Sequence, residues 1–287
     1  MCRRAMSSPS SSDRKREHRA MSLIAVERME GLDNVVLVRL DRPEQRNALS
    51  LDMLEGLTAA FGDLAVEPDV RVVVLAGAGA DFCAGADVAE LADSRSGTRA
   101  IEYGRYFDRT LAAIAAHPVP VIGRIHGAAL GGGCQLVLAC DLAVATGDAR
   151  LGIPSGRLGI VISYESIERL VLAVGPKRAG ELLFTGRVLS GDEAAAWGLV
   201  NGAARSRELD EAVADTARAV AEAAPLSVRA SKRGIAAALE NLGLDRLAEG
   251  HRVADFEMMS AQALASDDLV EGIEAFRERR EPRFKGT

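Results

Sequence analysis

Short apolar runs recur along this chain between polar stretches, and they predict buried β-strands. The runs are rich in valine, leucine and isoleucine, and glycine, proline or acidic residues bound them, as is typical of strands. One of the clearest is RVVVL, which begins at Arg71. The strands predicted in this way are residues 23–26, 34–40, 71–76, 119–125, 142–145 and 151–154.

Apolar residues three or four positions apart form a second pattern, which predicts amphipathic helices. Within residues 51–65, for example, Leu54, Leu57 and Phe61 follow this spacing, and Ser50 in front of them is a favoured N-cap residue. The same pattern predicts helices over residues 99–117, 163–174, 177–185, 191–197, 210–223, 227–242, 246–264 and 268–280.

The order of these elements predicts a mixed α/β fold. Two strands and a helix follow one another repeatedly, which favours a spiral of ββα units over a doubly wound sheet. We expect an α/β core over residues 21–205 and a helical segment over residues 206–287. Residues 1–20 are polar, basic and rich in serine, without the apolar core of a secretory signal, and we expect a disordered extension before a domain that starts near Met21.

Composition and charge narrow the class of protein. The chain has 287 residues, of which 48% are hydrophobic, so it can bury a sizeable core. Its net charge is -6 and its basic residues are scattered, which argues against a nucleic-acid surface. The longest apolar region, residues 128–145, is too short and too polar to span a bilayer. We therefore expect a soluble, cytoplasmic protein.

Cysteine and histidine give no metal signature. The four cysteines form no CxxC pair, and the four histidines are dispersed along the chain. We expect reduced and mostly buried thiols and no bound metal. His126 is interpreted as a hydrogen-bonded residue at a strand end, and Cys134 as a small core residue.

Two glycine-rich turns follow predicted strands and carry the candidate chemistry. Gly131–Gly133 follow the 119–125 run, and Gly85, Ala86 and Asp87 follow the 71–76 run. Glycine lets the backbone approach a ligand closely, and the first amides of a helix lack carbonyl partners. Such amides attract negative charge and can form an oxyanion hole. The alternative is close packing of a helix on a strand.

Nucleotide and serine-hydrolase motifs do not fit the glycine pattern. Gly77 and Gly79 follow a strand, but Phe82 stands where a dinucleotide fingerprint has its third glycine. The chain has no P-loop lysine motif after these glycines and no GxSxG nucleophile elbow.

Several long motifs in a fixed order resemble the crotonase (enoyl-CoA hydratase/isomerase) superfamily. They are RPEQRNALS from residue 42, AGAGADFCAGADVAEL from residue 76, PVPVIGRIHGAALGGGCQLVLACD from residue 118, LFTGRVLSGDEAAAWGLVN from residue 183 and EGIEAFRERREPRFKG from residue 271. The resemblance implies a crotonase-like spiral of repeated ββα units whose C-terminal helical segment forms trimers, often paired to hexamers. It also implies an acyl-CoA thioester as substrate, with no permanently bound cofactor.

The resemblance places an oxyanion hole at two main-chain amides. Matched residue by residue, these belong to Ala86 and Gly132, and they would hold the thioester oxygen as an enolate forms. Hydratases of the superfamily add two glutamates, at positions that hold Gln135 and Ser155 here. Neither side chain can serve as a carboxylate base, so ordinary hydration is expected to be lost or slowed. A single-base isomerase that uses the second glutamate is disfavoured for the same reason.

Other residues could act on the enolate in place of the missing glutamates. Tyr164 and Glu165 stand where the superfamily has small residues, and a tyrosine lies in this loop in its methylmalonyl-CoA decarboxylases, though not in strict register. The alternative is a helix start at which Glu165 interacts with the helix dipole. Asp87 is interpreted as an adenine-loop or capping residue rather than a base.

Coenzyme A contacts are also carried over by resemblance. They fall on Arg46, Ala48, Ala84, Asp87 and Val88, with Phe276 and Lys285 reaching the nucleotide of a neighbouring subunit. Three functions stay open: a hydratase/isomerase-like enzyme, a decarboxylase of malonyl-type thioesters, and a non-catalytic acyl-CoA binding protein.

Overall fold

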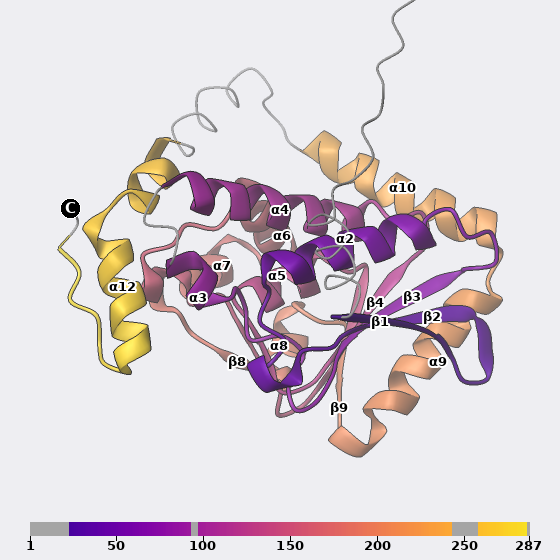
Figure 1. Cartoon of the computed structure of the whole chain (residues 1–287). Coiled ribbons are helices and arrows are strands. Elements are labelled where there is room, and N and C mark those ends of the chain that lie inside the picture. The colour runs from indigo at the N-terminus through magenta and orange to yellow at the C-terminus, as the bar shows by residue number, and fades with distance from the viewer. Residues whose placement is uncertain (1–22, 93–96, 243–257, 286–287) are drawn as a thin grey trace, which may run out of the picture.

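A six-stranded sheet forms the centre of the computed structural model, which describes residues 23–92, 97–242 and 258–285 (Figure 1). Its strand order is β1-β2-β3-β4-β6-β9. Strand β1 runs antiparallel to β2, and each of the following neighbours pairs in parallel. The strands are β1 (Ile24–Met29), β2 (Leu32–Leu40), β3 (Val72–Gly77), β4 (Val121–Ile125), β6 (Leu142–Thr146) and β9 (Gly202–Ala204).

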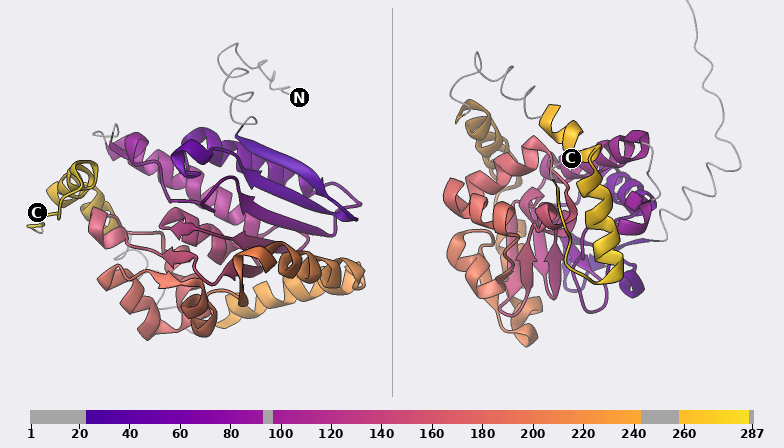
Figure 2. Two further views of the ribbon diagram at one scale, coloured as in Figure 1. Left: turned by 90° about the horizontal axis from the view of Figure 1, so that it is seen from below. Right: turned by 90° about the vertical axis from the view of Figure 1, so that its left-hand side faces the viewer.

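Both faces of this sheet are buried, each under a separate set of helices. Successive side chains of a strand point to opposite faces, so they enter two different cores. Val73 and Leu75 of β3 face the larger core, which contains side chains of α2 (Leu51–Leu64) and α4 (Gly97–Ala115). Val72 and Val74 face a smaller core with α9 (Leu209–Glu222). Figure 2 shows α9 on the opposite side of the sheet from α2 and α4. The segment predicted as C-terminal thus begins with a helix that covers the sheet.

A second sheet of three short strands lies beyond the end of the first. It consists of β5 (Ala128–Leu130), β7 (Arg150–Gly152) and β8 (Leu189–Ser190). The spiral path that the strand and helix order predicts is therefore present, but the short strands β5, β8 and β9 were not predicted. Two or three residues are too few to show a periodic pattern.

Helix positions agree closely with the predictions. Ser50 caps α2 as expected, since its hydroxyl oxygen accepts from the Met53 amide at 3.2 Å. Helix α8 (Gly191–Trp197) has the predicted bounds, and Ser190 and Glu193 form a capping box at its start. Further helices of the described residues are α3 (Val88–Ala92), α5 (Gly132–Ala139), α6 (Tyr164–Val174), α7 (Pro176–Thr185), α10 (Pro225–Leu242) and α12 (Asp267–Glu278), and residues 258–264 are helical as well. Three 3-10 turns are η1 (Pro43–Gln45), η2 (Ser155–Leu158) and η3 (Ser206–Glu208).

The C-terminal helix α12 packs beside η2 and α3 of its own chain. At Gly272 of α12, an added β-carbon would lie 2.6 Å from the Leu158 carbonyl carbon, so the two backbones are in direct contact. The predicted extension over residues 1–20 and most of the predicted helix 246–264 lie outside the described residues. Among the helices of the described ranges, none is long and apolar enough to cross a membrane.

Candidate active site

Two loops meet at the carboxyl end of the central sheet. One follows β3 and leads to α3, and the other follows β4 and leads through β5 to α5. Because β3 and β4 are paired in parallel, their carboxyl ends lie at the same edge and the loops leave side by side. Beyond the strand ends the two loops stay paired through a parallel bridge between Cys83 and Ala129, in which the Cys83 amide donates to the Ala128 carbonyl at 2.8 Å.

The direction of the Ala86 amide follows from its pairing with Leu49. The Leu49 amide donates to the Gly85 carbonyl at 2.8 Å, and the Leu49 carbonyl accepts from the Asp87 amide at 3.0 Å. In this parallel pairing, Leu49 bonds to the residues before and after Ala86. The N–H of Ala86 itself then points to the opposite side of its strand segment. The Ala86 N–H therefore points away from Leu49.

Gly131 and Gly132 lie against the loop that carries Ala86. A β-carbon added to Gly85 would lie 3.6 Å from the Gly132 nitrogen, and one added to Gly131 would lie 4.0 Å from the Gly85 Cα. Gly85 has φ 113° and Gly131 has φ 52°, in a region that side-chain-bearing residues rarely adopt. The structure thus brings the two sequence-predicted loops together, and glycine is what allows the approach.

Among the residues that the structure describes, neither predicted donor amide has an acceptor. Gly132 is the first residue of α5, where helix geometry provides no carbonyl for its N–H. Within the described part of the chain, the amides of Ala86 and Gly132 donate no hydrogen bond, whereas those of Gly131 and Asp87 beside them do. Two adjacent, unused backbone donors can hold one oxygen that carries negative charge.

Gln135 lies one turn along α5 from Gly132 and is 6% exposed. Residues three apart share a helix face, and a β-carbon on Gly132 would point at the Phe107 ring of α4, 3.1 Å away. The Gln135 amide group makes no side-chain hydrogen bond within the described residues, and its polar atoms keep some contact with solvent. A buried amide without a protein partner is available to a ligand.

The other sequence-predicted side chains sit on the next two elements. Ser155 begins η2 directly after Pro154 and is half-buried. Tyr164 and Glu165 form the first turn of α6, behind the N-cap residue Ser163, and both are exposed. The helix start proposed as the alternative is therefore present, and Glu165 lies where a negative charge interacts well with the helix dipole.

Asp108 of α4 adds a carboxyl group that the sequence reading missed. Although Asp108 is an exposed residue overall, partial desolvation of its carboxyl is the main cause of a raised pKa, and the Glu165 charge raises it further. A hydrogen bond from Ser163 and the charge of Arg169 act in the opposite direction. Because Ser163 is the N-cap residue of α6, its interaction with Asp108 places this carboxyl group between α4 and the start of α6. An acidic residue is common on the polar face of an amphipathic helix, so the sequence pattern does not distinguish Asp108 from other surface acids.

The predicted coenzyme A residues cluster at the first loop. Arg46 is exposed and donates from Nε to Asp81 at 2.6 Å, which holds the pKa of that carboxyl below its usual range. Asp87 caps α3 by accepting from the Ala89 amide at 3.0 Å, as the capping interpretation expects, and also pairs with Arg42 at 2.7 Å. Ala48, Ala84 and Val88 lie on the same paired segments.

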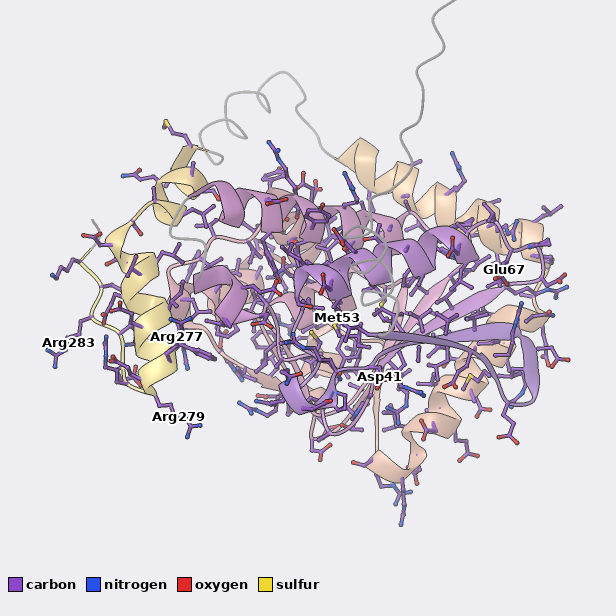
Figure 3. The ribbon with its side chains drawn as sticks, in the orientation of Figure 1. Asp41, Met53, Glu67, Arg277, Arg279 and Arg283 are labelled. Carbon is purple, nitrogen blue, oxygen red and sulfur yellow. The ribbon has the colours of Figure 1, made fainter. Side chains whose placement is uncertain are left out.

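Phe276 and Lys285 lie in the C-terminal segment around α12. The Phe276 side chain is 59% exposed, and the Lys285 amide donates to Asp268 at 2.6 Å. Arg277, Arg279 and Arg283 project from the same segment (Figure 3). The contact of Phe276 and Lys285 with a neighbouring subunit's nucleotide stays a prediction.

Two cysteines and a histidine near the loops have defined surroundings. Burial raises the pKa of the Cys83 and Cys134 thiols to about 12, so neither is a thiolate at neutral pH. The His126 ring bonds to Arg124 at 2.9 Å and to the Gly79 carbonyl at 2.9 Å, which confirms the interpretation of a hydrogen-bonded strand-end histidine. No cluster of metal-ligating side chains occurs among the residues that the structure describes.

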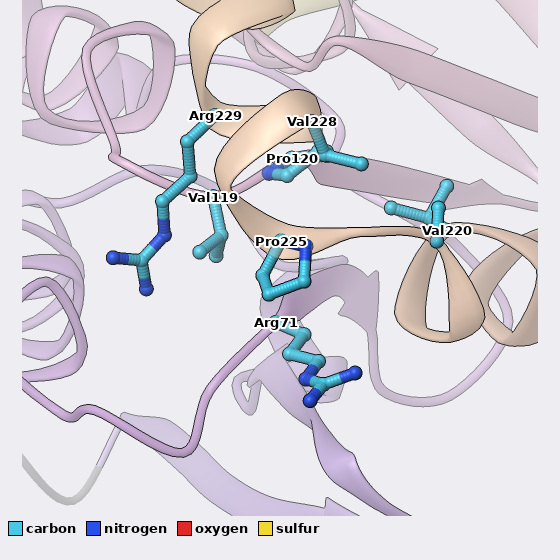
Figure 4. A pocket seen from close by; sticks show the side chains of 8 residues that line it. Arg71, Val119, Pro120, Val220, Pro225, Val228 and Arg229 are labelled. Carbon is cyan, nitrogen blue, oxygen red and sulfur yellow. The ribbon is translucent and has the colours of Figure 1, made fainter.

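A small cavity lies at the opposite edge of the sheet, between β3, β4 and the turn from α9 to α10 (Figure 4). Its volume is about 10 Å³, enough for one water molecule but not for an acyl chain. Arg71, Val119 and Arg229 are among its lining residues. It therefore has no part in the candidate site.

Comparison with known proteins identifies the family to which this fold and site belong. The family model described as enoyl-CoA hydratase/isomerase matches residues 30–287. The chain belongs to the enoyl-CoA hydratase/isomerase family. A relative from Thermus thermophilus, which carries the name "Putative enoyl-CoA hydratase", is 41% identical over 258 residues, covering 88% of this chain and 97% of its own.

Solved structures of the family superpose on most of the chain. An enoyl-CoA hydratase/isomerase from Xanthobacter autotrophicus Py2 has a TM-score of 0.79 at 28% identity, over 89% of this chain and 93% of its own. A methylmalonyl-CoA decarboxylase complexed with 2S-carboxypropyl CoA has a TM-score of 0.82 at 26% identity, over 92% of this chain and 98% of its own. Members with different reactions thus share this backbone.

Proposed function

We propose that this family member binds acyl-CoA thioesters and stabilises a thioester enolate between the amides of Ala86 and Gly132. The observation that carries the proposal is the pair of adjacent loops whose amides at these positions donate to no acceptor within residues 23–92, 97–242 and 258–285. Charge that develops on the thioester oxygen would be met by donors already in place, which costs no reorganisation during the reaction. In oxyanion holes generally, one donor lowers the barrier by about 3 kcal/mol.

The residues at the two glutamate positions argue against the two-glutamate hydration reaction. Gln135 and Ser155 occupy the positions of the two glutamates, and neither can take a proton from water at neutral pH. Gln135 can donate or accept a hydrogen bond, so it can orient a substrate group or a water molecule. Tyr164 and Glu165 at the start of α6, and Asp108 on α4, are then the candidates for proton transfer.

Decarboxylation of a malonyl-type thioester is the second candidate. In that reaction the bond to the carboxylate carbon breaks, carbon dioxide leaves and the electron pair becomes the enolate, so no base is needed to form it. A proton donor then completes the product. The absence of both glutamates and the similarity to a methylmalonyl-CoA decarboxylase support this reaction.

A third reading is an acyl-CoA binding protein without turnover. In this case the two amides hold the thioester carbonyl, and Gln135 and Ser155 only line the pocket. It predicts tight acyl-CoA binding with no product formed from any thioester.

Parallel assays with crotonyl-CoA, methylmalonyl-CoA and a long-chain acyl-CoA separate the three functions. Hydration of crotonyl-CoA supports the first, release of carbon dioxide from methylmalonyl-CoA the second, and binding without turnover the third. Failure of all three ligands to bind would contradict the proposal. If Gln135→Ala abolished measurable crotonyl-CoA hydration, the discounting of the hydratase reaction would be wrong.

We also propose that the enzyme is cytoplasmic and acts as a homotrimer or homohexamer. Exposed apolar side chains on the C-terminal helices support self-association, since solvent exposure of such a set is costly. They include Leu226, Ile235, Leu239, Val270 and Phe276. Mass measurement in solution tests the assembly, and a monomer at micromolar concentration would contradict it.

A further inference from the structure

Residues 42–49 form a loop that lies along the segment carrying Ala86. The Ala84 amide donates to the Arg46 carbonyl at 2.9 Å, and the Leu49 amide donates to the Gly85 carbonyl at 2.8 Å. These bonds fall on either side of Asn47. The position of the Ala86 amide therefore depends on the path of the 42–49 loop.

Asn47 is the side chain that ties this loop to the turn before Ala86. It is fully buried, at 0% exposed, and its Nδ2 donates to the carbonyls of Ala78 at 2.9 Å and Asp81 at 2.8 Å. Its Oδ1 accepts from the Arg42 amide at 2.9 Å. Both side-chain donors and the acceptor are used, and all partners are backbone atoms of the two loops.

The backbone of Asn47 also suits this role. Its φ is 55°, in the left-handed region, which asparagine tolerates better than most residues with a side chain. The Asn47 amide donates back to the Arg42 carbonyl at 2.9 Å, which closes the 42–47 turn. A residue in this place needs both an unusual backbone conformation and a side-chain amide.

We propose that Asn47 is a positioning residue for the oxyanion site: by tying residues 42–47 to the carbonyls of Ala78 and Asp81, it fixes the direction of the Ala86 amide. This inference rests on the proposed function, because it assumes that the Ala86 amide receives the thioester oxygen. Asn47 itself touches no reacting atom. Loss of its side chain should weaken binding of the charged oxygen far more than binding of the rest of the ligand.

The test compares two ligands in the full-length protein by calorimetry. One is a nitronate analogue of an acyl-CoA, whose charged oxygen stands in for the enolate oxygen. The other is the matching CoA thioether, which lacks any oxygen at that position. The variant is Asn47→Gly, because glycine accepts the positive φ and removes only the side-chain bonds.

A control variant separates positioning from general loss of stability. Val213→Ala opens a cavity under α9, on the face of the sheet away from the loops, where Val213 is 0% exposed. We expect it to lower the melting temperature and to leave both affinities unchanged. Asn47→Ser, which keeps one side-chain donor, is tested in the same way and covers the case in which Asn47→Gly does not fold.

The expected result is a nitronate affinity about tenfold or more lower in the Asn47 variant, with the thioether affinity changed only slightly. An equal loss for both ligands would leave the ratio of the two affinities unchanged. It would overturn the proposal and assign Asn47 a purely structural role, and so would no loss for either ligand. If the unmodified protein itself does not prefer the nitronate, the proposed function fails first, and this inference fails with it.

Discussion

Gly133 and Cys83 are in backbone contact where α5 meets the loop after β3. A β-carbon added to Gly133 would lie 2.2 Å from the Cys83 carbonyl oxygen and 2.9 Å from its Cβ. Real side chains do not approach so closely, and the Cys83 carbonyl cannot move aside easily, because it accepts from the Leu130 amide at 3.0 Å. The distance between the two candidate donor loops is therefore set by the absence of a side chain at residue 133.

Gly133→Ala is expected to force the two loops apart. We expect a loss of about 1–3 kcal/mol in the free energy of unfolding from overpacking, together with loss of acyl-CoA binding. Urea denaturation and calorimetry measure the two effects. Gly62→Ala in α2 is the matched control, because nothing lies within 4 Å of the added carbon. It should be neutral or stabilise by about 0.5–1 kcal/mol. Full acyl-CoA binding by Gly133→Ala would contradict the close approach.

Placing glutamate at residues 135 and 155 tests whether the lack of these carboxylates prevents hydration. The double variant Gln135→Glu with Ser155→Glu is expected to hydrate crotonyl-CoA at least about a hundredfold faster than the unmodified protein, because a general acid and a general base each contribute on this scale. Absorbance of the conjugated thioester follows the reaction. Each single variant serves as a control and should gain much less. No gain in the double variant would show that the backbone does not present these positions to the substrate.

His117 is expected to make stability depend on pH. The side chain is 2% exposed, its Nε2 has no partner among the described residues, and burial lowers its pKa to about 4. The unfolded chain, with a pKa near 6.5, binds the proton more tightly, so stability is retained above about pH 6.5 and falls between about pH 6.5 and 4. The largest loss from this group is about 3 kcal/mol.

Urea unfolding at pH 7.5 and pH 5 measures this effect. The comparison is made with His117→Gln, because other carboxyl groups also titrate in this range. The variant should lose part of the dependence on pH that the unmodified protein shows. An identical dependence in the two proteins would refute the assignment to His117.

Asp141 is expected to hold α10 to the start of β4. Its Oδ2 accepts from Lys232 and from the Val121 amide, both at 2.7 Å, and the Lys232 side chain is only 11% exposed. Asp141→Ala leaves both donors without this acceptor and should cost about 1–3 kcal/mol of unfolding free energy. Thermal and urea denaturation measure the loss.

The exposed pair of Arg39 and Glu27 provides the control for Asp141→Ala. Its atoms are 2.6 Å apart, but the side chains are 34% and 49% exposed. Glu27→Ala should therefore change stability by no more than about 0.5 kcal/mol. Equal losses for the two variants would show that burial of Lys232 does not strengthen its pair.

The sequence by itself determined the kinds of element, most of their positions and the family. Helices such as α2 and α8 are predicted by the local spacing of apolar residues and by their cap residues. Strand β3 is predicted to be buried because it is a run of apolar residues that begins with three valines. It also determined that no glutamate stands at residue 135 or 155. These properties depend on neighbours along the chain, so they can be read without coordinates.

Only the tertiary structure decided how distant segments meet. The closeness of Gly85 to Gly132 arises from the parallel pairing of β3 with β4, and the direction of the Ala86 amide arises from Leu49, far away in sequence. Helix α9 covers the second face of the sheet because that face would otherwise stay exposed. Such contacts depend on strand order and backbone geometry, which hydrophobic periodicity does not encode.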